Sequence, residues 1–220
     1  MTHGNRLKLE NKINIFYLDK DQYACAQGHL DKHVVKMILE YAQLLSTAHR
    51  VLDGVITEGV SATGRKRKSY VISDSRESHL YAATHVNHPS AVWVRKSREN
   101  YLWLANMLLV LCEEYTHRYG KSHKVERVKL CWLLLNRIPS NIGIEGWSEP
   151  TTAMPDDYKV SGDAITSYRN YYLKDKVRIA RWTNRSMPDW FSAGINTLYN
   201  DTGCMQQSKS GRIVSMPTNQ

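Results

Sequence analysis

The sequence lacks the features that mark a secreted or membrane-inserted protein. It has only four cysteines among 220 residues, and no two of them form a CxxC pair. This pattern excludes a disulfide scaffold and indicates packed thiols in a reducing compartment. The N-terminus has no apolar signal-peptide core, and the longest apolar run, residues 101–112, is too short to span a bilayer. We therefore expect a cytoplasmic protein with no membrane partner.

Phenylalanine and acidic residues are also scarce. Two Phe stand beside thirteen Tyr and six Trp, residues that can stack on bases and still offer a polar group. The twenty-one acidic residues are outnumbered by thirty Lys and Arg, which gives a net charge of +9. Phosphate backbones bind such an excess of positive charge through counterion release. We expect a nucleic-acid partner, DNA before RNA, and a monomer.

The positive charge is densest between two predicted helices, where residues 64–70 read Gly-Arg-Lys-Arg-Lys-Ser-Tyr. We expect residues 54–76 to be a mobile loop that a ligand would order. A second polar cluster follows Asn87-His88-Pro89, at the start of a predicted helix. The candidate nucleic-acid-binding residues are Arg65, Lys66, Arg67, Lys68, His88, Arg95 and Arg118.

Helical periodicity and capping residues predict an all-α fold, a single-domain helical bundle with long loops and a short N-terminal extended segment. The bundle is expected over residues 13–198, between a flexible extension at 1–12 and a disordered tail at 199–220. The extended segment is expected at 13–18, and a long loop at 138–160. The expected helices cover residues 21–29, 31–52, 77–84, 98–119, 123–136 and 163–180.

The helix predicted from residue 31 carries a titratable stripe on an otherwise amphipathic surface. At about 100° per residue, His33, Lys36 and Glu40 fall on one face, together with Gln43 and Thr47. An acid, a base and a cation within reach of one another are typical of a cleft that performs acid–base chemistry. The alternative is an ordinary solvated helix face. We take Glu40, His33 and Lys36 as the candidate catalytic residues.

Two other arrangements have simpler interpretations. Cys25, His29 and His33 recur every four residues, and His85 and His88 form an HxxH pair, so both offer ligands for zinc. Such spacings are common by chance, and we expect no metal and no cofactor.

Between residues 113 and 123, several charges indicate a solvated helix end with ion pairs.

A larger pattern resembles a known family. The segment from Val34 to Glu40, then Asn87-His88-Pro89, Tyr101-Leu-Trp-Leu, Glu113-Glu114-Tyr115 and Arg118-Tyr119-Gly120 follow the order of landmarks in the pyrimidine-dimer DNA glycosylases. The resemblance covers roughly residues 13–125, and the chain as a whole also looks like proteins of marine bacteriophages. The resemblance to the glycosylases implies a small helical DNA-repair enzyme. The resemblance to phage proteins implies that the enzyme acts in the cytoplasm of an infected host cell.

The resemblance also implies a mechanism. In the family, a helix-borne glutamate supports attack by the N-terminal amine on the sugar C1′, which gives a Schiff base, release of the base and strand cleavage. Glu40 matches that glutamate, whereas about eleven residues separate Thr2 from the first core segment. The Thr2 amine, Lys32 or Lys36 are the candidate nucleophiles. Without one of them, the lyase step would be absent.

The sequence therefore predicts a DNA-acting enzyme that works at the glycosidic bond of a damaged or modified pyrimidine nucleotide, a DNA glycosylase with or without lyase activity. Glu40 would be its carboxylate. Reaching that bond in a duplex requires bending the DNA and flipping a nucleotide. One alternative is a base-modifying or metal-dependent phosphate-cleaving enzyme of phage nucleic-acid metabolism. Another is a nucleic-acid-binding protein without catalytic activity.

Overall fold

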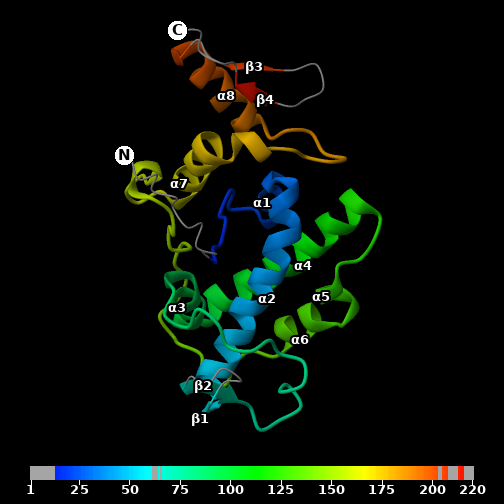
Figure 1. Ribbon diagram of the computed structural model, residues 1–220, viewed down its shortest axis with the longest axis vertical. Coiled ribbons are helices and arrows are strands. Elements are labelled where there is room, and N and C mark those ends of the chain that lie inside the picture. Colours follow the sequence, from blue (N-terminus) through cyan, green and yellow to red (C-terminus); the bar gives the residue numbers. More distant parts are fainter. Residues whose placement is uncertain (1–12, 61–63, 65, 203–204, 208–212, 216–220) are drawn as a thin grey trace.

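The structure is a computed structural model that describes residues 13–60, 64, 66–202, 205–207 and 213–215. The fold over these residues is mostly helical, as expected, but two small antiparallel hairpins make it less than all-α (Figure 1). The α-helices are α1 (Gln22–Gly28), α2 (Asp31–Asp53), α3 (Pro89–Lys96), α4 (Arg98–Tyr119), α5 (Lys124–Arg127), α6 (Leu130–Asn136), α7 (Ala164–Tyr171) and α8 (Asp189–Thr202). The strands are β1 (Val55–Val60), β2 (Lys66–Val71), β3 (Met205–Gln207) and β4 (Ile213–Ser215).

The two long helices, α2 and α4, pack against each other and form the centre of the molecule. Both begin and end where the sequence predicts. Ser97 caps α4 by accepting a hydrogen bond from Asn100 N, and Gly120 ends it in the left-handed conformation (φ 65°). Gly54 follows the last residue of α2. The apolar face of α2 and the nearly all-apolar first half of α4 supply much of the core.

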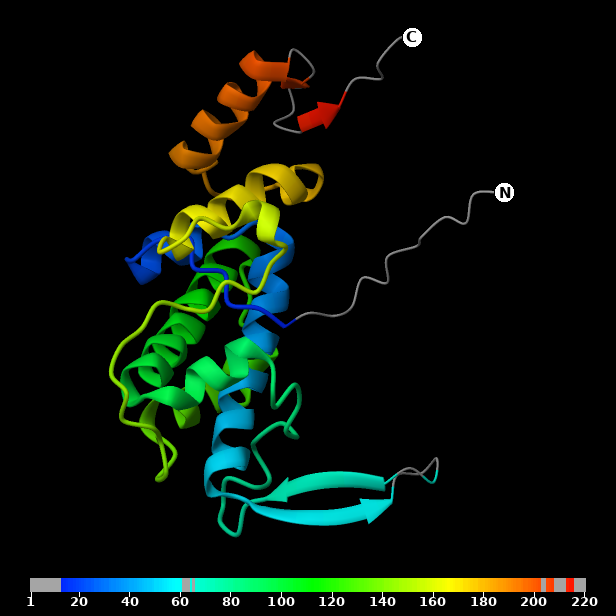
Figure 2. The same cartoon turned by 90° about the vertical axis from the view of Figure 1, so that its left-hand side faces the viewer.

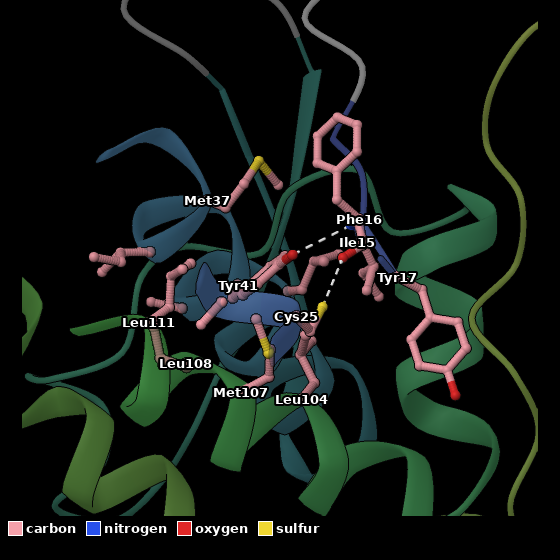
Figure 3. Packing of buried hydrophobic residues seen from close by; sticks show 14 of the residues in the cluster. Ile15, Phe16, Tyr17, Cys25, Met37, Tyr41, Leu104, Met107, Leu108 and Leu111 are labelled. Atoms are coloured by element: carbon pink, nitrogen blue, oxygen red, sulfur yellow. Dashed lines mark hydrogen bonds between the residues drawn. The ribbon is translucent and has the colours of Figure 1, made fainter. Parts of the chain in front are cut away.

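The N-terminal extended segment, residues 13–18, is confirmed, and it is buried against α2. Phe16 N donates to the hydroxyl of Tyr41 (3.2 Å), and the Cys25 thiol donates to Phe16 O (3.4 Å) (Figure 3). Side chains of α1 and α2 thus make hydrogen bonds with backbone groups of this segment that would pair with a neighbouring strand in a sheet. These contacts hold the first core segment against α1 and α2.

The basic segment after α2 differs from the expected mobile loop. β1 and β2 form an antiparallel hairpin with Val55 opposite Val71 and Val60 opposite Lys66. It projects from one end of α2 (Figure 2). The helix expected over 77–84 is absent from this fully described stretch, which forms turns. Arg50 instead holds its backbone by donating to the carbonyl oxygens of Glu77, Leu80 and Tyr81.

One helix was not predicted, and another was predicted as too long. Helix α3 was not among the expected helices; it begins at Pro89, which occupies the first turn, where the missing N–H costs nothing. The helix expected over 123–136 is split into α5 and α6 at Lys129, whose backbone is left-handed (φ 57°).

The long loop at 138–160 crosses the fold and is held at its centre. Ser148 N donates to Asn100 Oδ1 (3.0 Å), and Trp93 Nε1 donates to Ser148 O (3.1 Å). Trp147 contacts Trp93 and Trp103 with ring centroids 6.0 Å apart in both cases. The loop is therefore anchored by an aromatic cluster that bridges α3 and α4.

The C-terminal part continues as α7, a single π-helical turn η2 (Tyr172–Lys176) and a 3₁₀ turn η3 (Val177–Ile179), so the helix expected over 163–180 changes its winding near the middle. A further 3₁₀ turn, η1 (Asp156–Tyr158), precedes α7. In the tail expected at 199–220, α8 extends to Thr202, and β3 pairs with β4. The rest of that tail, like the extension at 1–12, lies outside the described residues. None of the helices in the described ranges has both the length and the apolar character needed to cross a membrane.

Candidate active site

A pocket of about 700 Å³ opens beside the middle of α2. Three further segments complete its wall: the start of the buried N-terminal segment, the turns before α3, and the start of α5. A volume of this size accommodates a nucleotide-sized ligand. Its lining residues are Ile13, Val35, Lys36, Leu39, Glu40, Gln43, Tyr81, Thr84, His85, His123 and Lys124.

Glu40 is the only acidic residue among those lining side chains, and it is 8% exposed. Its Oε1 lies 3.0 Å from Lys36 Nζ, and its Oε2 accepts a weak hydrogen bond from Asn14 N (3.4 Å). Burial raises the pKa of Glu40 above its ordinary value, although the hydrogen bond and the charge of Lys36 offset part of that effect. The site therefore holds a partly desolvated carboxyl group beside an ammonium group.

Lys36 is the more accessible member of the pair, with 47% of its side chain exposed. It lies one helical turn before Glu40, so the i, i+4 spacing brings the two together as the sequence predicts. Lys32, the other candidate lysine nucleophile, is exposed and is not part of the pocket lining. The Thr2 amine lies outside the described residues.

The far wall of the pocket adds positive or ionisable groups. His85 has a left-handed backbone (φ 50°), uncommon for a residue other than glycine, and its Nδ1 lies 2.8 Å from Thr84 Oγ1. Burial and the charge of Arg127 lower the pKa of His123. Lys124 is exposed at the rim. Lys36 and Lys124 are the two lysines among the described lining residues, and they favour an anionic ligand.

His33 does not belong to this site. It lies on the same face of α2 as Glu40 but seven residues away, about 10 Å along the helix axis. Its Nδ1 lies 2.6 Å from the Tyr172 hydroxyl, and its ring stacks on Phe16 at 4.2 Å. Burial lowers the pKa of His33 well below its ordinary value. The expected partnership with Glu40 is therefore wrong, and His33 is a neutral core residue.

The residues considered for zinc have other partners. Cys25 contacts the backbone of residues 16 and 18, and the two ring nitrogens of His29 contact Cys25 O and the Tyr41 hydroxyl. His88 caps α3 and accepts from Ser90 N. In the described ranges, no group of three or more His, Cys, Asp or Glu side chains is placed to hold a metal ion.

Arg118 is the clearest correction among the expected phosphate-binding residues. Its side chain is fully buried, with Nε 2.6 Å from Glu114 Oε1 and Nη1 2.9 Å from Asp31 Oδ1. Arg185 also binds Glu114, with Nη2 2.8 Å from Oε2. The expected solvated helix end is therefore a buried charge network that fastens α4 to α2 and to the segment before α8. Arg118 is not accessible to DNA.

The other expected phosphate-binding residues differ in accessibility. Arg95 is half-buried; its Nη2 donates to Val86 O (3.0 Å), and its Nη1 is enclosed and has no hydrogen-bond partner among the described residues. Lys66 and Lys68 are exposed on β2. Arg65 lies outside the described residues, and Arg67 has a described backbone only. Arg95, Lys66 and Lys68 do not line the Glu40 pocket.

Sequence reasoning missed most of the far wall. Tyr81 and Thr84 carry no motif, and Lys124 directly follows the charged segment 113–123 that was interpreted as a solvated helix end. Because these residues lie 41 to 84 positions from Glu40 in the sequence, helical periodicity gives no sign that they share its pocket. His85 was considered only as a metal ligand. Its proximity to Asn87-His88-Pro89 was the one signal available.

Comparisons with protein-family models, with curated proteins and with solved structures gave no match to this chain.

Proposed function

We propose that this protein is a DNA-acting enzyme that works at the glycosidic bond of a damaged or modified pyrimidine nucleotide, with Glu40 as its essential carboxylate. The observation that carries the proposal is the shielded carboxyl group of Glu40, 3.0 Å from Lys36 Nζ, in the wall of a pocket of about 700 Å³. The net charge of +9 supports a polyanionic partner.

Glycosidic bond cleavage builds positive charge on the sugar as the base departs. A carboxylate held close to the sugar C1′ stabilises that charge, and the stabilisation is stronger when little water surrounds it. The buried position of Glu40 suits this role. Lys124 and His85, on the other walls, are placed to face the anionic part of a bound nucleotide.

Lys36 offers an amine route. A protonated lysine has no lone pair, so attack on C1′ requires prior loss of a proton, and the carboxylate hydrogen-bonded to its Nζ is Glu40. The neutral amine then forms a bond to C1′ as the bond between C1′ and the base breaks, and the proton taken up by Glu40 passes to the departing base. If Lys36 does not attack, water takes its place, and the enzyme is a hydrolytic glycosylase.

The test is base release from duplexes that contain ultraviolet photoproducts, modified pyrimidines or abasic sites, with and without borohydride. We expect the wild-type protein to release a base from at least one duplex and Glu40→Gln to reduce the rate by about a hundredfold or more. Glu113→Gln is the matched control, because Glu113 is exposed on α4. A borohydride-trapped adduct at Lys36 would assign the amine route.

Two results would overturn the proposal. One is the absence of base release, strand cleavage and adduct across the whole panel. The other is full activity of Glu40→Gln. DNA binding without any such reaction would identify the protein as a nucleic-acid-binding protein instead.

A further inference from the structure

The β1–β2 hairpin has no core face. Every residue of β1 is exposed, and the apolar side chains of Val55, Ile56 and Val60 are 55% to 71% exposed. A two-stranded ribbon is at best marginally stable unless it packs on another surface. The body of the protein covers neither strand along its length (Figure 2). The described residues of this ribbon are therefore accessible to a partner outside the chain.

The charge of the ribbon indicates what that partner is. In the antiparallel register, Lys66 is opposite Val60 and Lys68 is opposite Glu58, so Lys66 has no carboxylate across from it. These residues surround an open hollow of about 370 Å³ together with Gly59. Exposed lysines beside exposed valines match a surface that offers both phosphates and apolar groups. The major groove of DNA offers phosphate backbones at its edges and thymine methyl groups on its floor.

The dimensions of the ribbon agree with that groove. Six residues per strand span about 20 Å, and two strands lie about 4.8 Å apart between backbones. The major groove is about 12 Å wide and admits a two-stranded ribbon.

One side chain connects the ribbon to the Glu40 pocket. Arg50, near the end of α2, donates from Nη1 to Tyr70 O of β2 (2.9 Å) and from Nε to Tyr81 O (2.6 Å). Tyr81 lines the Glu40 pocket. The same guanidinium also binds the Glu77 carboxylate at 2.8 Å. The base of the ribbon and a wall of the pocket are therefore fixed to one another.

We propose that the β1–β2 hairpin lies in the major groove of duplex DNA and that Arg50 holds it at a fixed distance from the Glu40 pocket. The groove contact then determines which nucleotide along the duplex reaches Glu40. Figure 2 shows the hairpin and the segment between β2 and α3 on the same side of α2, as this arrangement requires. The inference rests on the proposed function for its partner, DNA, but not on the chemistry assigned to Glu40.

The test compares the wild-type protein with the double variant Lys66→Ala/Lys68→Ala. Binding of each protein to a fluorescein-labelled duplex is measured by anisotropy at several salt concentrations. Loss of two phosphate contacts is expected to weaken binding about tenfold and to reduce the slope of log K against log salt by about 1.8. The control is Lys20→Ala/Lys174→Ala, which removes the same charge from exposed positions outside the hairpin, one just before α1 and one in η2. Circular dichroism checks that all proteins fold.

Three outcomes would overturn the inference: a hairpin variant that binds the duplex within twofold of wild type, an equal loss in the control variant, and hairpin-dependent binding to vesicles of anionic lipid in place of the duplex. Wild-type protein that does not bind DNA at all would overturn the proposed function as well. A hairpin variant that binds weakly while Glu40→Gln binds normally separates the two proposals, and it is the result we expect.

Discussion

The Nδ1 atom of His33 lies 2.6 Å from the Tyr172 hydroxyl and thereby links α2 to the π-helical turn η2. Both side chains are buried, and the His33 ring stacks on Phe16. This contact explains why a histidine occurs on the polar stripe of α2 without belonging to the pocket. It holds the C-terminal elements against the first helices.

Replacing Tyr172 with Phe tests that structural role. The change removes the hydroxyl and leaves a buried ring nitrogen without its partner, so we expect a loss of about 1–2 kcal/mol in the free energy of unfolding. Urea denaturation measures the loss. Base release at a temperature where the variant is folded should remain within about twofold of wild type. A hundredfold loss of activity in a folded Tyr172→Phe protein would return His33 to the catalytic machinery.

Three buried histidines predict how stability depends on pH. Burial lowers the pKa of His29 to about 4, and burial together with the charge of Arg76 lowers the pKa of His49 to about 4. Burial also lowers the pKa of His33 well below its ordinary value. Between about pH 4 and 6.5 the unfolded chain therefore binds protons at His29 and His49 that the folded chain does not bind, and His33 contributes an effect of the same sign. The free energy of unfolding should therefore fall as the pH falls, by up to about 1 kcal/mol per pH unit for each histidine. Urea denaturation from pH 7 to 4.5 measures it, and a flat profile would contradict burial of neutral rings.

Glu40 predicts a pH dependence of the free energy of unfolding that is opposite in sign and smaller in size. Because burial raises its folded-state pKa, the folded chain binds this proton more readily than the unfolded one, and ionisation of Glu40 costs stability above that pKa. Glu40→Gln should therefore leave stability unchanged or raise it by about 1 kcal/mol at pH 7 while activity is lost. Thermal unfolding of the variant beside Glu113→Gln measures the difference. A clear loss of stability in Glu40→Gln alone would indicate that the carboxylate serves the fold.

The network around Arg118 predicts a large structural effect. Arg118→Ala leaves the carboxylates of Glu114 and Asp31 with less positive charge beside them in a buried setting. We therefore expect the free energy of unfolding to fall by about 3–5 kcal/mol. The matched control, Arg127→Ala, removes an exposed arginine and should change stability by less than about 0.5 kcal/mol. Chemical denaturation distinguishes the two. Near-equal stability of both variants would contradict the buried network.

Acid should weaken the same network. Burial alone would raise the pKa of Glu114, but hydrogen bonds from Arg185 and Arg118 outweigh burial and lower it. A carboxyl group with a lowered folded-state pKa stabilises the fold above its unfolded pKa, and this contribution disappears as the pH falls through the folded value. The difference in stability between wild type and Arg118→Ala should therefore narrow below about pH 4.5. A difference that stays constant down to pH 3 would contradict this account.

Arg50 predicts a local effect on dynamics. Arg50→Met removes the donors that hold Tyr70, Tyr81 and Glu77, so hydrogen exchange of backbone amides over residues 70–81 should accelerate more than that of α4. We expect the free energy of unfolding to fall by about 3 kcal/mol. Arg178→Met, at an exposed position of η3, is the control. Unchanged exchange over residues 70–81 would show that the ribbon and the pocket wall are held by other contacts.

The parts of the fold that the sequence predicts well are those with local signals. α4 is bounded by Ser97 and Gly120, and both act through short-range capping. The β1–β2 hairpin was missed because glycine and lysine in its sequence were interpreted as marks of a loop, although the valines and Ile56 favour strands. Lys36 and Glu40 were found because helical spacing alone joins them. His85 and Lys124 reach the same pocket only through tertiary packing, which no local pattern encodes.

The anchoring of the long loop through Trp147 gives the molecule an internal optical reporter. Three of its six indole rings meet where this loop crosses α3 and α4, and Trp147 is partly open to water whereas Trp93 is enclosed. Any event that lifts the loop would separate the Trp147 indole from the other two rings and change the polarity of its surroundings. The position of this segment can therefore be followed by intrinsic fluorescence without attaching a label.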